Sequence, residues 1–189
     1  MPYPSNEKQF EAPAERYIHR RFVRDVLNPP RNSLQWFTIN ATARAQPDRS
    51  WSAPDLLLVG VSSSALQPTP TLELIGFELK LKGNAGRAAV MQAKAQHMYL
   101  HRVYLTVCLD QIPRDNDPAL KDLTRCALEQ GVGLIWTTDA DDPQSYRVIT
   151  ECRRHTPEWD RLERLLRNSA GPSHLERIRT WLAHSYSTG

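Results

Sequence analysis

A strand-helix-strand unit in the middle of the sequence places the strongest constraint on the fold. Residues 72–82, LELIGFELKLK, alternate between apolar and polar side chains, which is the period of a β-strand. A helical stretch is expected over 84–102, and the apolar run 103–109 is typical of a buried strand. Two strands joined by one helix pair in parallel with a right-handed crossover. The unit therefore predicts an α/β fold.

The remaining elements predict a mixed central β-sheet flanked by helices. Residues 1–12 are expected to be a loose lead-in, and Pro13 suits the first turn of a helix that ends before Pro29. The residues 1–152 are expected to form the core, and 153–189 a C-terminal helical extension packed on the core or at a dimer interface. The elements expected outside the central unit are helices at 13–27, 118–130, 157–168 and 173–185, and strands at 34–43, 54–61, 132–137 and 146–150.

Composition limits the class of protein without naming a function. The chain has 189 residues, of which 40% are hydrophobic, so it can build a core. Its net charge of +3 tolerates a nucleic-acid partner but does not require one. Cys108, Cys126 and Cys152 form no CxxC pair, which argues against a disulfide framework or a structural zinc site. With no apolar run of membrane-span length and no signal-like start, we expect a cytoplasmic protein without a membrane partner.

Two of the expected strands carry charged residues beside apolar ones. Pro54-Asp55 begins one strand, and Glu78-Leu79-Lys80 lies in the next. Glu78 and Lys80 project to the same face because strand side chains have a period of two. Both carboxylates adjoin strongly apolar stretches, where an unpaired charge is costly. A bound cation would remove that cost.

A glutamine-rich helical stretch follows the Glu-Leu-Lys motif, and the whole arrangement resembles the PD-(D/E)XK nuclease superfamily. That superfamily includes restriction enzymes, Holliday junction resolvases and RecB-type nuclease domains. The resemblance covers roughly residues 10 to 138. It implies a restriction endonuclease-like fold in which Asp55, Glu78 and the carbonyl of Leu79 bind Mg²⁺, or Mn²⁺ as a substitute. Lys80 then orients the attacking water or stabilises charge on the phosphate.

The resemblance also implies supporting residues from two helices. An acid on the first helix faces the metal in many members, and Glu15 is the expected residue, with Glu11 as the alternative. RecB-like members carry a glutamine four residues before a tyrosine, whereas Gln96 and Tyr99 are only three apart. Gln92 is expected to reach the active site or the phosphate backbone.

Basic residues after the Glu-Leu-Lys motif suggest where a nucleic acid would bind. Cations hold phosphates without reading sequence. His97 and His101 have i, i+4 spacing but lack the glutamate of a zinc protease motif, so we expect surface or packing roles. The residues expected to contact nucleic acid are Lys82, Arg87, Lys94, Gln96 and Tyr99.

These features predict a magnesium-dependent endonuclease that hydrolyses phosphodiester bonds of DNA in preference to RNA. Restriction, defence, transposition and junction processing are all open roles. The small size predicts a homodimer, or a partner protein that supplies specificity. Two alternatives remain open, namely a non-catalytic nucleic-acid-binding or assembly subunit that keeps the fold, and an RNA-directed nuclease.

Overall fold

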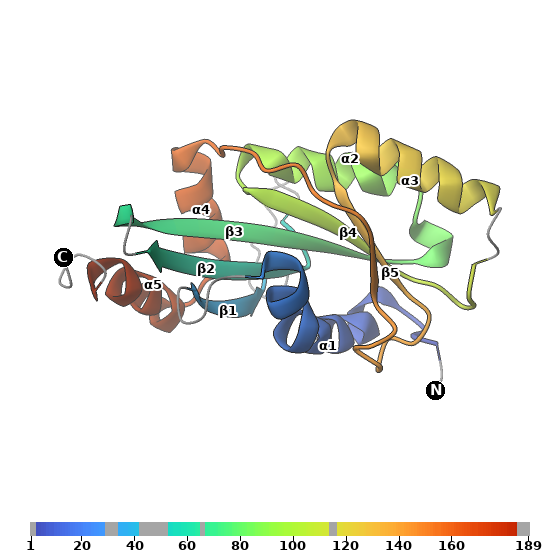
Figure 1. Ribbon diagram of the computed structural model, residues 1–189, viewed down its shortest axis with the longest axis horizontal. Coiled ribbons are helices and arrows are strands. Elements are labelled where there is room, and N and C mark those ends of the chain that lie inside the picture. The colour runs from blue at the N-terminus through green and yellow to red at the C-terminus, as the bar shows by residue number, and fades with distance from the viewer. Residues whose placement is uncertain (1–2, 29–33, 42–52, 65–66, 114–116, 185–189) are drawn as a thin grey trace.

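The expected strand-helix-strand unit forms the centre of the fold in the computed structural model (Figure 1). Strand β3 (Gln67–Leu81) runs parallel to β4 (Arg102–Cys108), and the connection contains α2 (Arg87–Ala95) and the 3₁₀ turn η3 (Gln96–Met98). The structure describes residues 3–28, 34–41, 53–64, 67–113 and 117–184.

The described strands form one mixed sheet in the order β1-β2-β3-β4-β5-β6. The pairs β1–β2, β2–β3 and β5–β6 are antiparallel, whereas β3–β4 and β4–β5 are parallel. The α/β class with a mixed, helix-flanked sheet is thus confirmed. The other strands are β1 (Leu34–Asn40), β2 (Leu56–Ser64), β5 (Gly133–Thr137) and β6 (Arg147–Thr150).

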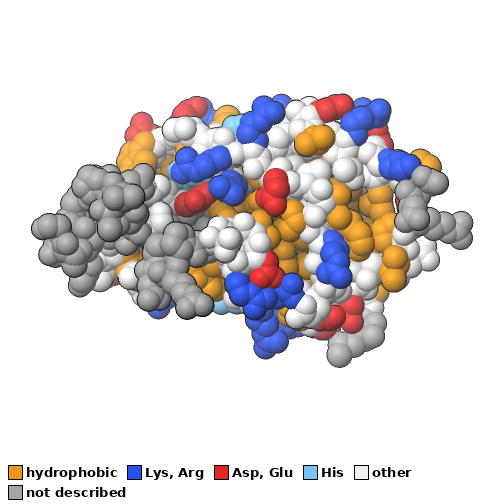
Figure 2. All heavy atoms as spheres, viewed as in Figure 1, with side chains coloured by type: hydrophobic (Ala, Val, Ile, Leu, Met, Phe, Trp, Pro, Cys, Tyr) orange, Lys and Arg blue, Asp and Glu red, His pale blue; other side chains and the backbone are white. Residues whose placement is uncertain are grey.

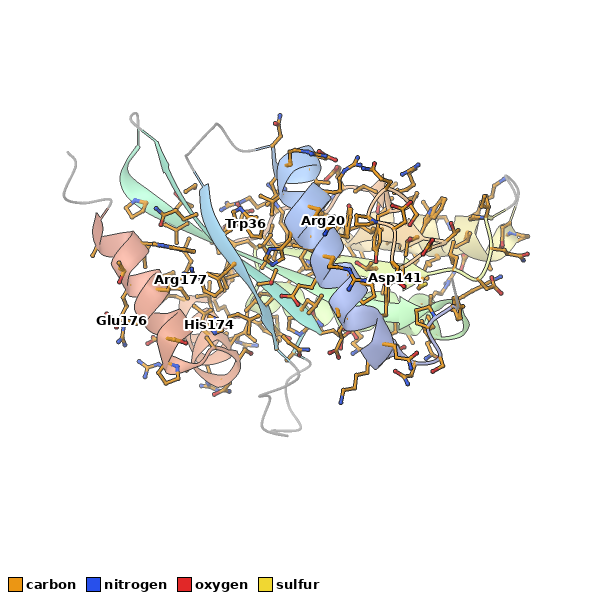
Figure 3. The ribbon with its side chains drawn as sticks, turned by 90° about the horizontal axis from the view of Figure 1, so that it is seen from below. Arg20, Trp36, Asp141, His174, Glu176 and Arg177 are labelled. Carbon is orange, nitrogen blue, oxygen red and sulfur yellow. The ribbon has the colours of Figure 1, made fainter. Side chains whose placement is uncertain are left out.

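Helices cover both faces of the sheet. The helix α1 (Glu7–Tyr17) and the π-helix η1 (Ile18–Leu27) cross one face, and Figure 3 shows them lying across the sheet with α5 on the far side of β1. The opposite face packs against α2 and the other helices, which contribute Leu123, Leu162 and Ile178 to one shared apolar cluster. These helices are α3 (Pro118–Gln130), α4 (Trp159–Ser169) and α5 (Pro172–His184).

The alternation of β3 divides its side chains between these two layers. Ile75, Phe77 and Leu79 lie in the apolar cluster beneath α1 and η1. Leu74 lies in the cluster beneath α2, and Glu78 shares its face. Burial of each large apolar side chain contributes about 1.5–3 kcal/mol, so a one-residue slip of this strand would be very costly. The packing therefore fixes which face carries Glu78.

The first helix begins earlier than the sequence predicts. Asn6 caps α1 by accepting a hydrogen bond from the Gln9 N–H at 3.0 Å, so the helix starts at Glu7. The expectation of a loose lead-in over 1–12 is wrong, and Pro13 lies inside the helix instead of in its first turn. Pro13 is buried, so core packing there offsets the hydrogen bond that proline cannot donate.

Other element boundaries differ by smaller amounts. The helix expected over 84–102 is shorter, because Gly86 precedes α2 and a 3₁₀ turn follows Ala95. The helix at 118–130 has the expected bounds, with Asp117 as its cap and Gly131 in the left-handed conformation at its end. None of the helices within the described ranges combines the length and apolar character that crossing a membrane requires.

Candidate active site

The β2–β3 ladder brings Asp55 and Glu78 face to face. Leu56 pairs with Phe77 in this antiparallel ladder, and the same register continued by one residue places Asp55 opposite Glu78. Directly opposed residues have Cβ atoms about 5 Å apart, and two like charges in such positions destabilise a sheet. The ladder therefore holds two carboxylates together at the end of β2.

Asp55 is fixed by the backbone of the neighbouring strand. Its Oδ2 accepts a hydrogen bond from the Leu79 N–H at 2.7 Å, in the place where the backbone of β2 would otherwise continue the ladder. Burial and then the charge of Glu78 raise the pKa of Asp55 to about 7, against the opposing effects of the Leu79 N–H and of Lys80. Near neutral pH this carboxyl group is therefore poised between its protonated and charged forms.

Glu78 is the most enclosed acid of the group, with only 1% of its surface exposed. Its Oε1 accepts a hydrogen bond from Lys80 Nζ at 2.7 Å, and its Oε2 accepts one from Gln96 Nε2 at 2.8 Å. Gln96 is fully buried in η3. Both carboxylate oxygens are thus oriented by a fixed donor, as a buried charge requires.

Lys80 carries the positive charge of the site. Burial is the largest single influence and lowers the pKa of Lys80, but the hydrogen bond to Glu78 and the charges of Glu78, Asp55 and Glu7 together raise it above its ordinary value. Lys80 is therefore an ammonium at neutral pH. It can orient a water molecule or stabilise negative charge, but it has no free pair of electrons to act as a base.

The acid that reaches this group from the first helix is Glu7. Its Oε2 lies 3.6 Å from Lys80 Nζ, and its Oε1 accepts a hydrogen bond from Asn84 Nδ2 at 2.9 Å. The sequence analysis missed Glu7 because it placed this residue before the helix. The signal available was Asn6, a strong N-cap residue directly before an acid of the first turn.

The structure places Glu15 and Glu11 at β1. Glu15 accepts a hydrogen bond from Thr38, and the Glu11 Oε2 accepts one from Asn40 Nδ2 at 2.6 Å. Glu7, Glu11 and Glu15 follow one another at i, i+4 spacing, so they line one face of α1. Because the helix begins at Glu7, its first acid, not its third, lies beside Lys80. The assignment of Glu15 to the site is therefore corrected to Glu7.

The glutamine that supports the site is Gln96, not Gln92. Ala89, Val90 and Ala93 form the buried side of α2, and Gln92 lies on the exposed side. Gln96 lies one turn further along the chain, in η3, where it is buried and donates to Glu78. The prediction that Gln92 reaches the active site is therefore corrected to Gln96.

The residues expected to contact nucleic acid fall into two groups. Gln96 and Tyr99 are only 0% and 2% exposed, so their predicted contact with a nucleic acid is corrected to a buried position. Burial and the charge of Glu78 also raise the pKa of Tyr99. The three cations are at the surface, where Lys82 pairs with Asp110, Arg87 with Asp122, and Lys94 with Gln130. Exposed pairs contribute about 0–1 kcal/mol, so they leave these cations open to exchange.

The histidines serve packing roles. His101 is 9% exposed, and its Nδ1 accepts a hydrogen bond from the Leu74 N–H at 3.1 Å. The His97 ring lies 3.9 Å from that of His155, and burial lowers the pKa of His97 to about 4. Within the ranges that the structure describes, no three or more His, Cys, Asp or Glu side chains form a group suited to a metal ion.

Two carboxylates nevertheless fit a magnesium ion. Mg²⁺ takes one or two protein carboxylates and completes its shell largely with water. The N–H and C=O of one strand residue point toward the same neighbouring strand. Since the Leu79 N–H points to Asp55, the Leu79 carbonyl faces that side as well. Asp55, Glu78 and the Leu79 carbonyl would therefore hold the ion, which would offset the repulsion between Glu78 and a charged Asp55.

Comparisons with known proteins do not extend this picture. No protein-family model and no curated protein matches the chain. Among solved structures, it is similar to the SPO1766 protein of unknown function from Silicibacter pomeroyi, at 17% sequence identity and a TM-score of 0.45. The match covers 97% of this chain and 96% of that one. A likeness at this level carries no argument about function.

Proposed function

We propose that this protein is a magnesium-dependent endonuclease that hydrolyses phosphodiester bonds of DNA and belongs to the PD-(D/E)XK superfamily. One observation carries the proposal. Asp55 and Glu78 oppose each other across two strands, and the residue between Glu78 and Lys80 donates its N–H to Asp55. The two acids and the ammonium of Lys80 therefore converge on one point of the sheet.

Each residue has a separate task in this proposal. Asp55 and Glu78 would hold Mg²⁺, which activates water and offsets charge on the phosphate. The Lys80 ammonium orients the attacking water or stabilises the negative charge that develops on the phosphate oxygens. Gln96 keeps the Glu78 carboxylate in place by donating to Oε2. Cys108, Cys126 and Cys152 are free and buried, which fits the cytoplasm as the proposed compartment.

Cleavage of supercoiled plasmid by purified protein tests this function. We expect nicking that depends on Mg²⁺ or Mn²⁺ and falls by about 100-fold or more in Asp55→Asn and Glu78→Gln. Glu15→Gln is the matched control, because it makes the same chemical change two turns along α1 from Glu7, where Glu15 accepts from Thr38. Metal-dependent nicking that persists in Glu78→Gln would refute the assigned ligands.

A matched RNA substrate separates the two nuclease hypotheses. Faster cleavage of RNA than of DNA by the same residues would assign the chemistry to an RNA-directed enzyme. Calorimetry with Mg²⁺ tests the alternative of a non-catalytic binding subunit. A protein that binds nucleic acid but neither cleaves it nor binds Mg²⁺ would be such a subunit.

A further inference from the structure

A cavity lies at the carboxyl ends of the parallel strands β3 and β4, beside the candidate active site. Its volume is about 520 Å³, and the residues that line it follow the ends of β3 and β4 or belong to the start of α3. In open α/β sheets the crevice beyond the carboxyl ends of parallel strands is where ligands bind. The residues that line it include Lys82, Leu109, Gln111, Ile112, Asp117 and Leu120.

The cavity lies directly beyond the end of β3, the strand that carries Glu78 and Lys80. Lys80 pairs with Val107 and Leu81 with Cys108, so Lys82 follows directly after the end of the ladder. Lys82 lies two residues beyond Lys80, roughly 7 Å along an extended strand. Phosphates recur along a nucleic-acid strand, so a strand cut at Lys80 brings a nearby phosphate to Lys82.

The walls of the cavity suit a flat ring with polar edges. Ile112 is 78% exposed, and Figure 2 shows hydrophobic side chains gathered at the surface beneath α3. Large aliphatic side chains so exposed often mark binding surfaces when they adjoin other apolar groups. Gln111 adds an amide at the same cavity, and amides hydrogen-bond to base edges, whereas the Asp117 carboxylate is engaged as the cap of α3.

Lys82 supplies a positive charge in a fixed place. Its backbone N–H donates to the Tyr3 hydroxyl at 3.1 Å, and that hydroxyl donates to the Cys108 carbonyl at 3.0 Å. Tyr3 thus ties the ends of β3 and β4 together. The Lys82 Nζ pairs with Asp110 at 2.9 Å, but both side chains are exposed and this weak pair yields readily to a phosphate.

We propose that this cavity receives an unstacked nucleobase from a single-stranded segment of DNA, while Lys82 binds the phosphate beside it. The inference rests on the proposed function, since it names the substrate that the same site would cut. A base in a duplex is held in its stack and cannot enter, whereas a single strand presents its bases freely. The protein therefore selects single-stranded or branched DNA over a continuous duplex.

Binding without divalent metal tests the cavity independently of cleavage. Fluorescence anisotropy compares an oligothymidylate with a fully abasic oligonucleotide of the same length and charge. We expect the wild-type protein to bind the first about fivefold more tightly, the equivalent of about 1 kcal/mol from burying one base face. Equal affinity for the two would overturn the proposal.

Variants assign the preference to the cavity. Ile112→Ser should abolish the preference for the base-containing strand, whereas Ile149→Ser, an exposed isoleucine on the edge strand β6, should keep it. Lys82→Gln should weaken the binding of both oligonucleotides equally. It should also reduce the slope of log affinity against log salt concentration by about one. Retention of the base preference in Ile112→Ser would contradict the proposal.

The two proposals fail in different ways. Plasmid cleavage that depends on Glu78, with no base preference in wild-type protein, would leave the proposed function intact and reject the cavity as a base site. A preference lost in Ile112→Ser, with no cleavage of any substrate in Mg²⁺, would support the base site and reject the proposed function.

Discussion

Gln96 Nε2 lies 2.8 Å from Glu78 Oε2, and neither residue is more than 1% exposed. Gln96 is the first residue of η3, the 3₁₀ turn that begins where α2 ends at Ala95. The glutamine donates to Glu78, so it acts through Glu78 as a positioning residue. Its effect should therefore appear in the affinity for metal.

Replacing Gln96 with methionine tests that role. Loss of a group that orients a metal ligand costs about 10- to 100-fold in metal affinity or activity, and we expect this loss in Gln96→Met. The variant should also be less stable by about 1–3 kcal/mol, because methionine removes the donor that Gln96 Nε2 supplies to the buried Glu78 carboxylate. Mg²⁺ titration of the nicking rate measures the effect, and Gln92→Met on the exposed side of α2 is the control. Equal Mg²⁺ dependence of the two variants would rule out the positioning role.

The raised pKa of Asp55 predicts how stability changes with pH. Its pKa rises from 3.8 to about 7 on folding, so the folded state holds this proton more tightly than the unfolded chain. The free energy of unfolding therefore falls as pH rises from about 4 to about 7. Buried His97, whose pKa is lowered to about 4, contributes the opposite slope. The informative quantity is therefore the difference in Tm between wild type and Asp55→Asn, which we expect to fall as pH increases.

Magnesium should reverse this trend, since the ion and the proton compete for Asp55. The stabilisation by Mg²⁺, measured as the shift in Tm, should grow as pH rises through about 7 and should be lost in Asp55→Asn. A shift that is the same at all pH values would show that Asp55 does not bind the ion.

Lys80 should separate metal binding from catalysis. Its ammonium lies 2.7 Å from Glu78 Oε1, where it neutralises one of the two acids. In Lys80→Met we expect Mg²⁺ to bind more tightly by calorimetry, because a competing cation is gone. The cleavage rate should nevertheless fall by about 100-fold, since the charge on the phosphate is no longer stabilised. Lys8→Met, on the exposed side of α1, is the control; nicking by Lys80→Met at the wild-type rate would remove Lys80 from the mechanism.

The convergence of Asp55, Glu78 and Lys80 follows from information that the sequence contains locally. Alternation in 72–82 places Glu78 and Lys80 on one face, and the apolar run after Asp55 places that acid at the start of a strand. Only the pairing of β2 with β3 was needed to bring the three together. Neighbouring strands in sequence usually pair, so the short connection made this outcome predictable.

Residues contributed by helices were harder to predict. The choice between Glu7 and Glu15 depended on where α1 begins, and Pro13 favoured the wrong start. The choice between Gln92 and Gln96 depended on which turn of the helical segment lies beside Glu78. Residues at i and i+4 share a helix face, so a shift of one turn along the axis exchanges one polar residue for another.

The close contact between Gly133 and Tyr104 gives a test of the fold that does not depend on function. A Cβ at Gly133 would lie 2.2 Å from Tyr104 Cδ1, and Tyr104 is itself fully buried. Its ring packs against Phe22 and Phe77 at centroid distances of 5.0 and 5.8 Å, so it has no room to move. We therefore expect Gly133→Ala to lower the free energy of unfolding by about 3 kcal/mol, measured by urea denaturation.

Gly83→Ala is the matched control for this test. No atom lies within 4 Å of a Cβ built at Gly83, so the same added methyl group should change stability by no more than about 0.5 kcal/mol. The comparison is specific to the parallel pairing of β4 with β5, which sets Tyr104 directly opposite Gly133. If both variants unfold at the same midpoint urea concentration as the wild type, that register is wrong.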